Sequence, residues 1–380
     1  MSIFRNIVVL TAAVVGATEA PLVFAQPMSR GVLISSTPLD GAPTGASAFR
    51  IRYRSQAVGG GRNEVTGVVI VPDSAAPRGG RDVVAWAHGT SGVAESCAPS
   101  QSKELFRSIA GLNAMLSAGY AVVATDYAGL GTPGPHPYLA GDGSAYSVLD
   151  SIRAAREFGR GSIGRRYVVW GESQGGHAAL WTAQYAARYA PELQLAGAAA
   201  AAPPTDLKEN LTGGTNPLIK ALLTAYTSVS WSQTYRIPLS TILKPVGQNL
   251  ATRLARNCVS TDPVALRTKI GLFRFSRSLA NVDISTSPRW AEQLRRNSVK
   301  PSGFTAPVFI AQGSADLIVA PNVTLNFAQS LCRSRAVPVR YLAIAGGDHF
   351  SIGKRSADAT VRWIAGRFAG LAAPDDCGRF

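Results

Sequence analysis

The stretch that decides the fold is residues 167–181, YVVWGESQGGHAALW, with Gly-Glu-Ser-Gln-Gly at positions 171–175. An apolar run precedes this pentapeptide and a run of small and apolar residues follows it, which predicts a strand, a sharp turn and a helix. Glycine is needed on both sides of Ser173, because side chains there would collide with the neighbouring strand and helix. A Gly/Ser turn could arise by chance, but the flanking pattern favours a serine hydroxyl exposed beside a helix N-terminus.

Two further residues complete a set suited to acyl transfer. Asp316 follows the apolar run 308–311, and His349 follows the run 339–344. Parallel strands end at the same edge of a sheet, so we expect both side chains to lie near Ser173. A serine hydroxyl needs a base to take its proton, and the base needs an acid to orient it. The order Ser, Asp, His is that of the α/β-hydrolase arrangement, and it predicts Ser173 as nucleophile, His349 as base and Asp316 as acid.

The three other histidines receive structural interpretations. His177 falls in the helix after the pentapeptide, where a packed core residue is expected. His88 belongs to a His-Gly turn and is interpreted as a structural or oxyanion-loop residue. His136, between two prolines, either contacts substrate or lies on a surface loop, and we favour the surface loop.

Donors for the negative charge on the substrate oxygen are also needed. The backbone N–H of Gln174, the residue after the nucleophile, is one candidate. The second should come from a loop after an earlier strand, where Thr90 and Asp126 compete. The residues alone do not choose between them, and they do not identify the substrate-binding side chains.

The whole chain of 380 residues has the composition of a globular protein, with 46% hydrophobic and 16% charged residues. Short apolar runs alternate with helical patterns such as 144–158 and 356–368, which predicts an α/β fold with a mainly parallel central sheet flanked by helices. The predicted strands cover residues 83–87, 121–124, 167–170, 195–200, 308–311 and 339–344.

Residues 204–300 break this alternation. They contain amphipathic helical pieces at 216–226, 250–256 and 290–296, and proline-containing segments open and close the stretch. We interpret it as a helical cap inserted between a first core part, 26–203, and a second core part, 301–380. A separate domain with its own core is the alternative.

Residues 1–25 have the pattern of a signal peptide. One arginine precedes a short apolar run, and Val-Phe-Ala at 23–25 offers a cleavage site, with Ala20 as a second choice. The expected location is therefore secreted or periplasmic. Four cysteines suit an oxidising compartment, and of three pairings we favour Cys97–Cys258 and Cys332–Cys377. Zinc ligation is disfavoured because histidines at ligand spacing are missing, and no metal or cofactor is expected.

The net charge of +15 could favour anionic partners. The basic residues are scattered, however, and aromatic residues are not interleaved with them, so nucleic acid is not expected as a partner. A generally basic surface is the simpler interpretation.

Several motifs together resemble those of the secretory lipases, the family that includes yeast lipase A. They are Ala-His-Gly-Thr at 87–90, Thr-Asp-Tyr-Ala-Gly-Leu-Gly at 125–131, His-Pro-Tyr-Leu at 136–139, and the stretches 148–154, 171–176, 312–321 and 347–350. The resemblance implies an exported, disulfide-bonded α/β-hydrolase with a helical cap, acting on carboxylic esters. It also implies Asp126 rather than Thr90 as the second oxyanion donor. The cap gives no match, so the resemblance does not indicate the substrate.

The sequence hypothesis is therefore a lipase or esterase that acts on a small-molecule or lipid ester through an acyl-enzyme. A peptidase or amidase on the same fold, and a non-catalytic binding scaffold, are the alternatives. Acyl chain length, the alcohol part, transient contact with a lipid interface and the oligomeric state stay open.

Overall fold

A single nine-stranded sheet organises the computed structural model, which describes residues 30–213, 216–259, 266–279 and 282–380. The strand order is β1-β2-β3-β5-β4-β6-β7-β8-β9. The first three strands and the β3–β5 pair are antiparallel, and all pairs from β5 to β9 are parallel. The predicted signal peptide lies outside the described residues.

The strand bounds are β1 Leu33–Leu39, β2 Ala46–Gln56, β3 Arg62–Pro72, β4 Arg81–Ala87, β5 Ala121–Thr125, β6 Ile163–Glu172, β7 Gln194–Ala201, β8 Val308–Gly313 and β9 Val339–Ile344. The six predicted strands correspond to β4–β9. The sequence analysis missed β1–β3, although β2 carries a readable signal: Ile51 and Tyr53 are buried while Arg52 and Arg54 are exposed. Such alternation is typical of an antiparallel strand with one solvated face.

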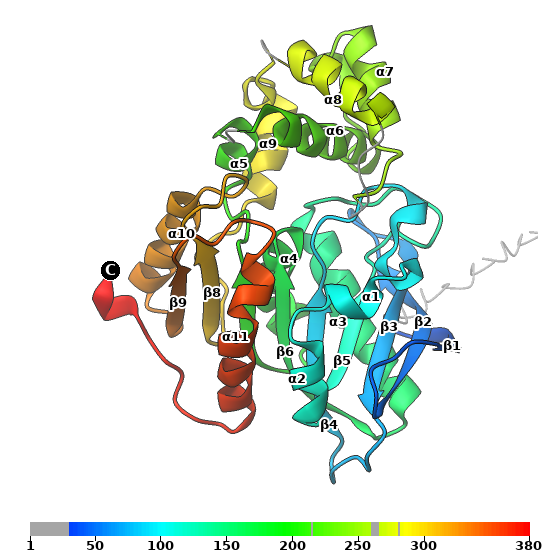
Figure 1. Cartoon of the computed structure of the whole chain (residues 1–380), viewed down its shortest axis with the longest axis vertical. Helices are drawn as coiled ribbons and strands as arrows, with labels where there is room; N and C mark the ends of the chain where they lie inside the picture. The colour runs from blue at the N-terminus through cyan, green and yellow to red at the C-terminus, as the bar shows by residue number, and fades with distance from the viewer. Residues whose placement is uncertain (1–29, 214–215, 260–265, 280–281) are drawn as a thin grey trace, which may run out of the picture.

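Helices cover both faces of the sheet (Figure 1). They are α1 Leu105–Ser108, α2 Leu112–Ser117, α3 Gly141–Gly159, α4 Gln174–Tyr189, α10 Pro321–Ser334 and α11 Ile352–Phe368. One buried cluster joins α3, α4 and α10 to one face of the sheet, and a second joins α1, α2 and α11 to the other. Apolar side chains therefore alternate between two cores along the parallel strands, which explains why those strands are apolar throughout. The fold is that of the α/β-hydrolases, as predicted.

A third buried cluster belongs to the helices between β7 and β8. These are α5 Leu207–Gly213, α6 Pro217–Thr234, α7 Pro245–Leu254, α8 Leu266–Ser278 and α9 Pro288–Asn297, here called the cap helices. They lie beyond the carboxyl ends of the parallel strands (Figure 1). Tyr138 and Leu139 from the core also join this cluster, so the cap helices pack directly on the loop that precedes α3. Within the described ranges, none of the helices is both long and apolar enough to cross a bilayer.

Two disulfides join the pairs favoured from the sequence, Cys97–Cys258 and Cys332–Cys377. The first links a short turn after β4 to the segment that follows α7, so it ties the cap helices to the core. The second links α10 to the C-terminal tail. The two bridges close loops of different length, with sequence separations of 161 and 45.

Removing the Cys97–Cys258 disulfide, which closes the longer loop, is expected to destabilise the protein more than removing Cys332–Cys377. For Cys97→Ser/Cys258→Ser we expect a loss of about 5 kcal/mol in the free energy of unfolding, because a long cross-link restricts the unfolded chain most. For Cys332→Ser/Cys377→Ser the same relation gives about 4 kcal/mol. Urea unfolding without reductant measures both. A larger loss for the shorter loop would contradict the loop-entropy argument.

Candidate active site

Ser173 occupies the predicted sharp turn between β6 and α4. Its backbone has φ 52° and ψ −120°, a conformation that L side chains rarely adopt. The flanking glycines are required by close packing: a Cβ on Gly175 would overlap the Ala87 carbonyl oxygen, and a Cβ on Gly171 would overlap Gly175. The Ser173 N–H donates to the Ala201 carbonyl at 2.8 Å, which anchors the strained residue to β7.

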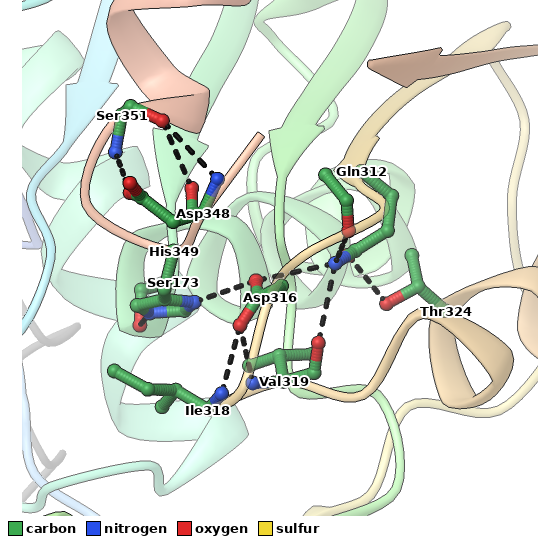
Figure 2. Close-up of polar contacts among 10 residues, drawn as sticks. Ser173, Gln312, Asp316, Ile318, Val319, Thr324, Asp348, His349 and Ser351 are labelled. Carbon is green, nitrogen blue, oxygen red and sulfur yellow. Dashed lines mark hydrogen bonds and ion pairs between the residues drawn. The ribbon is translucent and has the colours of Figure 1, made fainter. Parts of the chain in front are cut away.

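Ser173, His349 and Asp316 form one hydrogen-bonded line. His349 Nε2 lies 2.9 Å from Ser173 Oγ, and His349 Nδ1 lies 2.8 Å from Asp316 Oδ2. Figure 2 shows the imidazole between the hydroxyl and the carboxylate. Asp316 is buried, and the His349 side chain is almost so. The structure thus brings together the three side chains that the sequence analysis selected, from loops after β6, β8 and β9.

Asp316 is held on both of its oxygens (Figure 2). Oδ1 accepts hydrogen bonds from the backbone N–H groups of Ile318 and Val319, both at 2.9 Å. Oδ2 accepts from Gln312 Nε2 at 3.1 Å, in addition to its contact with His349. Gln312 is itself oriented by the Thr324 hydroxyl, which donates to Gln312 Oε1 at 2.9 Å. The sequence analysis missed this role for Gln312, whose position at the end of β8 was the available signal.

The loop that carries His349 is shaped by two local features. Asp348 Oδ1 accepts from the Ser351 backbone N–H at 2.9 Å, which closes a turn before α11. Hydrogen bonds from the backbone and side chain of Ser351 lower the pKa of the exposed Asp348 carboxyl. At Gly313, a Cβ would overlap the Gly347 carbonyl, so glycine lets the loops after β8 and β9 approach each other. This close approach places His349 beside Asp316.

Glu172, the residue before the serine, contributes a second carboxyl group near His349. Its side chain fills the space left by the missing side chains of Gly353 and Gly89. Burial raises its pKa to about 6, and the nearby basic groups of His349 and Lys354 partly oppose that shift. The sequence analysis did not single out Glu172, because its environment is made by three distant segments.

This raised pKa predicts how stability depends on pH. Between pH 4.5 and 6 the folded protein holds a proton that the unfolded chain has lost, so the free energy of unfolding falls as pH rises through that window. Glu172→Gln should remove the contribution of Glu172 to this fall in the free energy of unfolding, which is about 2 kcal/mol between pH 4.5 and 6. Urea unfolding on either side of the window measures it, with the exposed Glu95→Gln as matched control. The same pH dependence in parent and Glu172→Gln would contradict the assignment.

The candidate oxyanion donors have different hydrogen-bonding states. The backbone N–H of Gln174 opens α4, where first-turn donors have no partner within the helix. The backbone N–H of Asp126 donates to the Thr66 carbonyl at 2.8 Å. Both Asp126 carboxylate oxygens also accept hydrogen bonds, one from the Thr66 hydroxyl and one from the Ser100 N–H. Burial raises the pKa of this carboxyl. The backbone N–H and both carboxylate oxygens of Asp126 are therefore occupied by structural hydrogen bonds.

Thr90 is hydrogen-bonded to a residue that lines the cavity beside the serine. Its hydroxyl is 2.8 Å from the Tyr138 hydroxyl. Tyr138 in turn lines the same cavity as Ser173 and Gln174. One hydrogen bond thus links the loop after β4 to the lining of the cavity beside Ser173.

The favoured interpretation of His136 as a surface residue is wrong, because its side chain is only 1% exposed. Nδ1 lies 2.9 Å from the Ala128 carbonyl, so Nδ1 carries the hydrogen. Nε2 is then an acceptor, and the Gln174 amide donates to it at 3.1 Å. Burial lowers the pKa of His136 to about 3, which keeps the ring neutral. His136 therefore orients the side chain of Gln174, and proline neighbours alone could not reveal this burial.

The other two histidines are structural. His177 is fully buried, as predicted, and its Nε2 lies 2.7 Å from the Asn297 carbonyl at the end of α9. Burial lowers its pKa to about 4. His88 lies with Nδ1 2.6 Å from the Gly89 carbonyl and Nε2 3.2 Å from the Asp126 carbonyl. Both side chains join segments of the fold, and neither is hydrogen-bonded to the Ser173 hydroxyl in the described part of the chain.

The cavity beside Ser173 is narrow, with about 10 Å³ of free volume. That is room for about one water molecule. Apolar side chains from the cap helices and from the loop after β8 line it, namely Leu207, Leu211, Leu223, Ile318 and Val319. Two side-chain carbonyl oxygens that border it, Gln174 Oε1 and Asn210 Oδ1, are buried and have no donor in the described part of the chain.

Comparison with known proteins places this site in a sequence family. The model of the secretory lipase family matches residues 107–376. A Mycobacterium tuberculosis protein named a probable inactive lipase is 26% identical over 347 residues, which cover 88% of this chain and 76% of that protein. Lipase 5 of Candida albicans is 25% identical over 369 residues, which cover 87% of this chain and 74% of that protein.

Solved structures share the fold. Candida antarctica lipase A superposes with a TM-score of 0.75 at 19% identity, covering 92% of this chain and 84% of that one. The rice cell wall degrading esterase LipA from Xanthomonas oryzae gives a TM-score of 0.67 at 19% identity, covering 90% of this chain and 98% of that one. At these identities the likeness shows a common architecture.

Proposed function

Since the chain belongs to the secretory lipase family, and is on that ground a carboxylic ester hydrolase, we propose that it works through Ser173, His349 and Asp316. The observation that carries this proposal is the unbroken hydrogen-bonded line from Ser173 Oγ through the imidazole to a buried carboxylate. A strained serine at the start of a helix supports the same role.

The reaction proceeds in two steps. His349 Nε2 takes the proton of Ser173 as Oγ attacks the ester carbonyl carbon, and then returns that proton to the leaving alcohol. Asp316 keeps Nδ1 protonated and stabilises the imidazolium. Water then attacks the acyl-enzyme with His349 again as base, which releases the carboxylic acid and restores the serine.

Negative charge on the carbonyl oxygen is stabilised by the backbone N–H of Gln174. For the second donor we favour Thr90, because the backbone N–H and both carboxylate oxygens of Asp126 are already hydrogen-bonded within the core. Asp126 is the alternative that the family resemblance favours. His136, by orienting the Gln174 side chain, supports the loop that presents the first donor.

Substrate entry requires the cap helices to move away from Ser173. The cavity has room for about one water molecule, so we expect Leu207, Leu211 and Leu223 to move when an ester binds. The unpaired oxygens of Gln174 and Asn210 would accept hydrogen bonds from an alcohol part that keeps a free hydroxyl. Residues 204–300 serve in this proposal as a cap that excludes water from the acyl-enzyme.

Export completes the proposal. The N-terminal segment has the pattern of a signal peptide, and two disulfides are consistent with an oxidising compartment outside the cytoplasm. The mature chain would then begin at residue 26.

Initial rates on p-nitrophenyl esters from acetate to palmitate test the proposal, with emulsified triglyceride alongside and Ser173→Ala as blank. Turnover that depends on Ser173 is expected. Preference for long chains with triglyceride turnover identifies a lipase, and activity on short chains alone identifies an esterase. Faster turnover of a matched amide would favour the peptidase or amidase alternative. If neither substrate is turned over and a serine-reactive phosphonate leaves Ser173 unlabelled, the proposal is wrong and the scaffold alternative stands.

A further inference from the structure

The outermost cap helix, α8, is apolar on two opposite faces. Its inner face buries Leu272 and Phe275 in the cap cluster. Its outer face carries Leu266, Ile270 and Phe273, which are 72%, 45% and 56% exposed. These three residues are four and three positions apart, so they line up along one side of the helix. A surface helix is normally polar on that side, and an exposed apolar stripe indicates an interaction surface.

Basic side chains border this stripe. Exposed Lys269 and Arg274 flank it, and exposed Arg277 continues it by one turn towards the C-terminus. The helix contains no acidic residue, and residues 216–278 hold nine Lys and Arg against one Asp. In the ranges that the structure describes, none of these three cations forms an ion pair. Their charges are therefore available to an anionic partner.

The position of α8 suits a flat partner. With α7 it forms the end of the molecule farthest from the loops at the opposite edge of the sheet (Figure 1). On α7, which packs against α8, Val246 is also 71% exposed. A second copy of this chain fits poorly, because the same basic surface would face itself.

We propose that the outer face of α8 docks on an anionic lipid surface. The apolar stripe enters the boundary between headgroups and acyl chains, while the flanking cations contact lipid phosphates, and each contribution alone is weak. The inference deepens the proposed function by naming the surface that brings the cap to lipid, and it rests on that function only for its use. Binding itself needs no turnover.

Vesicle co-sedimentation of the mature Ser173→Ala protein tests the docking without hydrolysis of the vesicles. We expect binding to phosphatidylcholine vesicles that contain phosphatidylglycerol, little binding to pure phosphatidylcholine, and loss of binding in high salt. The stripe variant Leu266→Ser/Ile270→Ser/Phe273→Ser should bind at least about tenfold more weakly. Leu371→Ser, at an equally exposed leucine on the C-terminal tail, is its control and should bind as the parent does.

A second pair of variants isolates the charge. Lys269→Glu/Arg274→Glu should weaken binding about tenfold or more. Arg78→Glu/Arg165→Glu changes the net charge equally at exposed cations by the amino ends of β4 and β6, the sheet edge opposite the cap helices, and should not weaken binding. Equal loss in both charge variants, equal binding to both vesicle types, or undiminished binding of the stripe variant would overturn the proposal. So would a salt-dependent dimer that the stripe variant abolishes.

The outcome is separable from the proposed chemistry. In the active protein the α8 variants should hydrolyse a soluble p-nitrophenyl ester at the parent rate, because α8 does not border the cavity beside Ser173. Vesicle binding without ester hydrolysis would refute the catalytic proposal and leave the docking surface standing. Hydrolysis without vesicle binding would do the reverse.

Discussion

Ser173→Ala is expected to lower kcat on any ester substrate by about 10⁶-fold, since the nucleophile and base act as a unit. The change removes only a hydroxyl. The strained backbone is retained because the Ser173 N–H still donates to Ala201, and the flanking glycines still permit the close approach to Ala87. Folding should therefore be unaffected, and substrate should still bind.

Initial rates on a p-nitrophenyl ester and labelling by a phosphonate measure this effect, with the thermal midpoint as the check on folding. Ser96→Ala, a hydroxyl deletion at an exposed serine, is the matched control and should keep full activity. A Ser173→Ala protein that hydrolyses esters at more than about a hundredth of the parent rate would remove Ser173 from the mechanism. The family relative whose name calls it a probable inactive lipase makes this measurement informative.

Asp316→Asn is expected to lower kcat by about 10⁴-fold while the fold persists. Every neighbour of the Asp316 carboxylate presents a hydrogen to it: the N–H groups of Ile318 and Val319 on Oδ1, and Gln312 with His349 on Oδ2. Asparagine has only one oxygen. If that oxygen faces the two backbone N–H groups, the amide hydrogens face His349 Nδ1 and favour the tautomer with hydrogen on Nε2. That tautomer cannot accept the proton of Ser173.

Asp348→Asn is the matched control, because it removes the same charge from the residue next to His349 but from a fully exposed position. We expect it to change kcat less than about threefold, since exposed charges are screened by water and the asparagine oxygen can still accept from the Ser351 N–H that closes the turn. A loss below about tenfold for Asp316→Asn, or equal losses for both variants, would contradict the assigned role.

The parallel half of the fold was readable in advance, because strands buried on both faces must be apolar throughout and their helices must carry one apolar face. The antiparallel β1–β3 were missed although β2 alternates visibly. The site residues were predicted for a related reason. The signals were local in the sequence: a serine with the required glycines on both sides, and an Asp and a His that each follow an apolar run.

What the sequence by itself determined is therefore local: the strand-turn-helix around Ser173, the order Ser, Asp, His, and the amphipathic pieces of the cap helices. The tertiary structure alone decided the burial of His136 against Gln174, the raised pKa of Glu172, the grip of Gln312 on Asp316, and the engagement of Asp126 within the core. Each of these depends on which segments, distant in the sequence, pack together in the fold. Burial and hydrogen bonding arise only from that packing. The outer face of α8 was undecided for the same reason, since only the packing of Leu272 and Phe275 shows which of its two apolar faces remains in water.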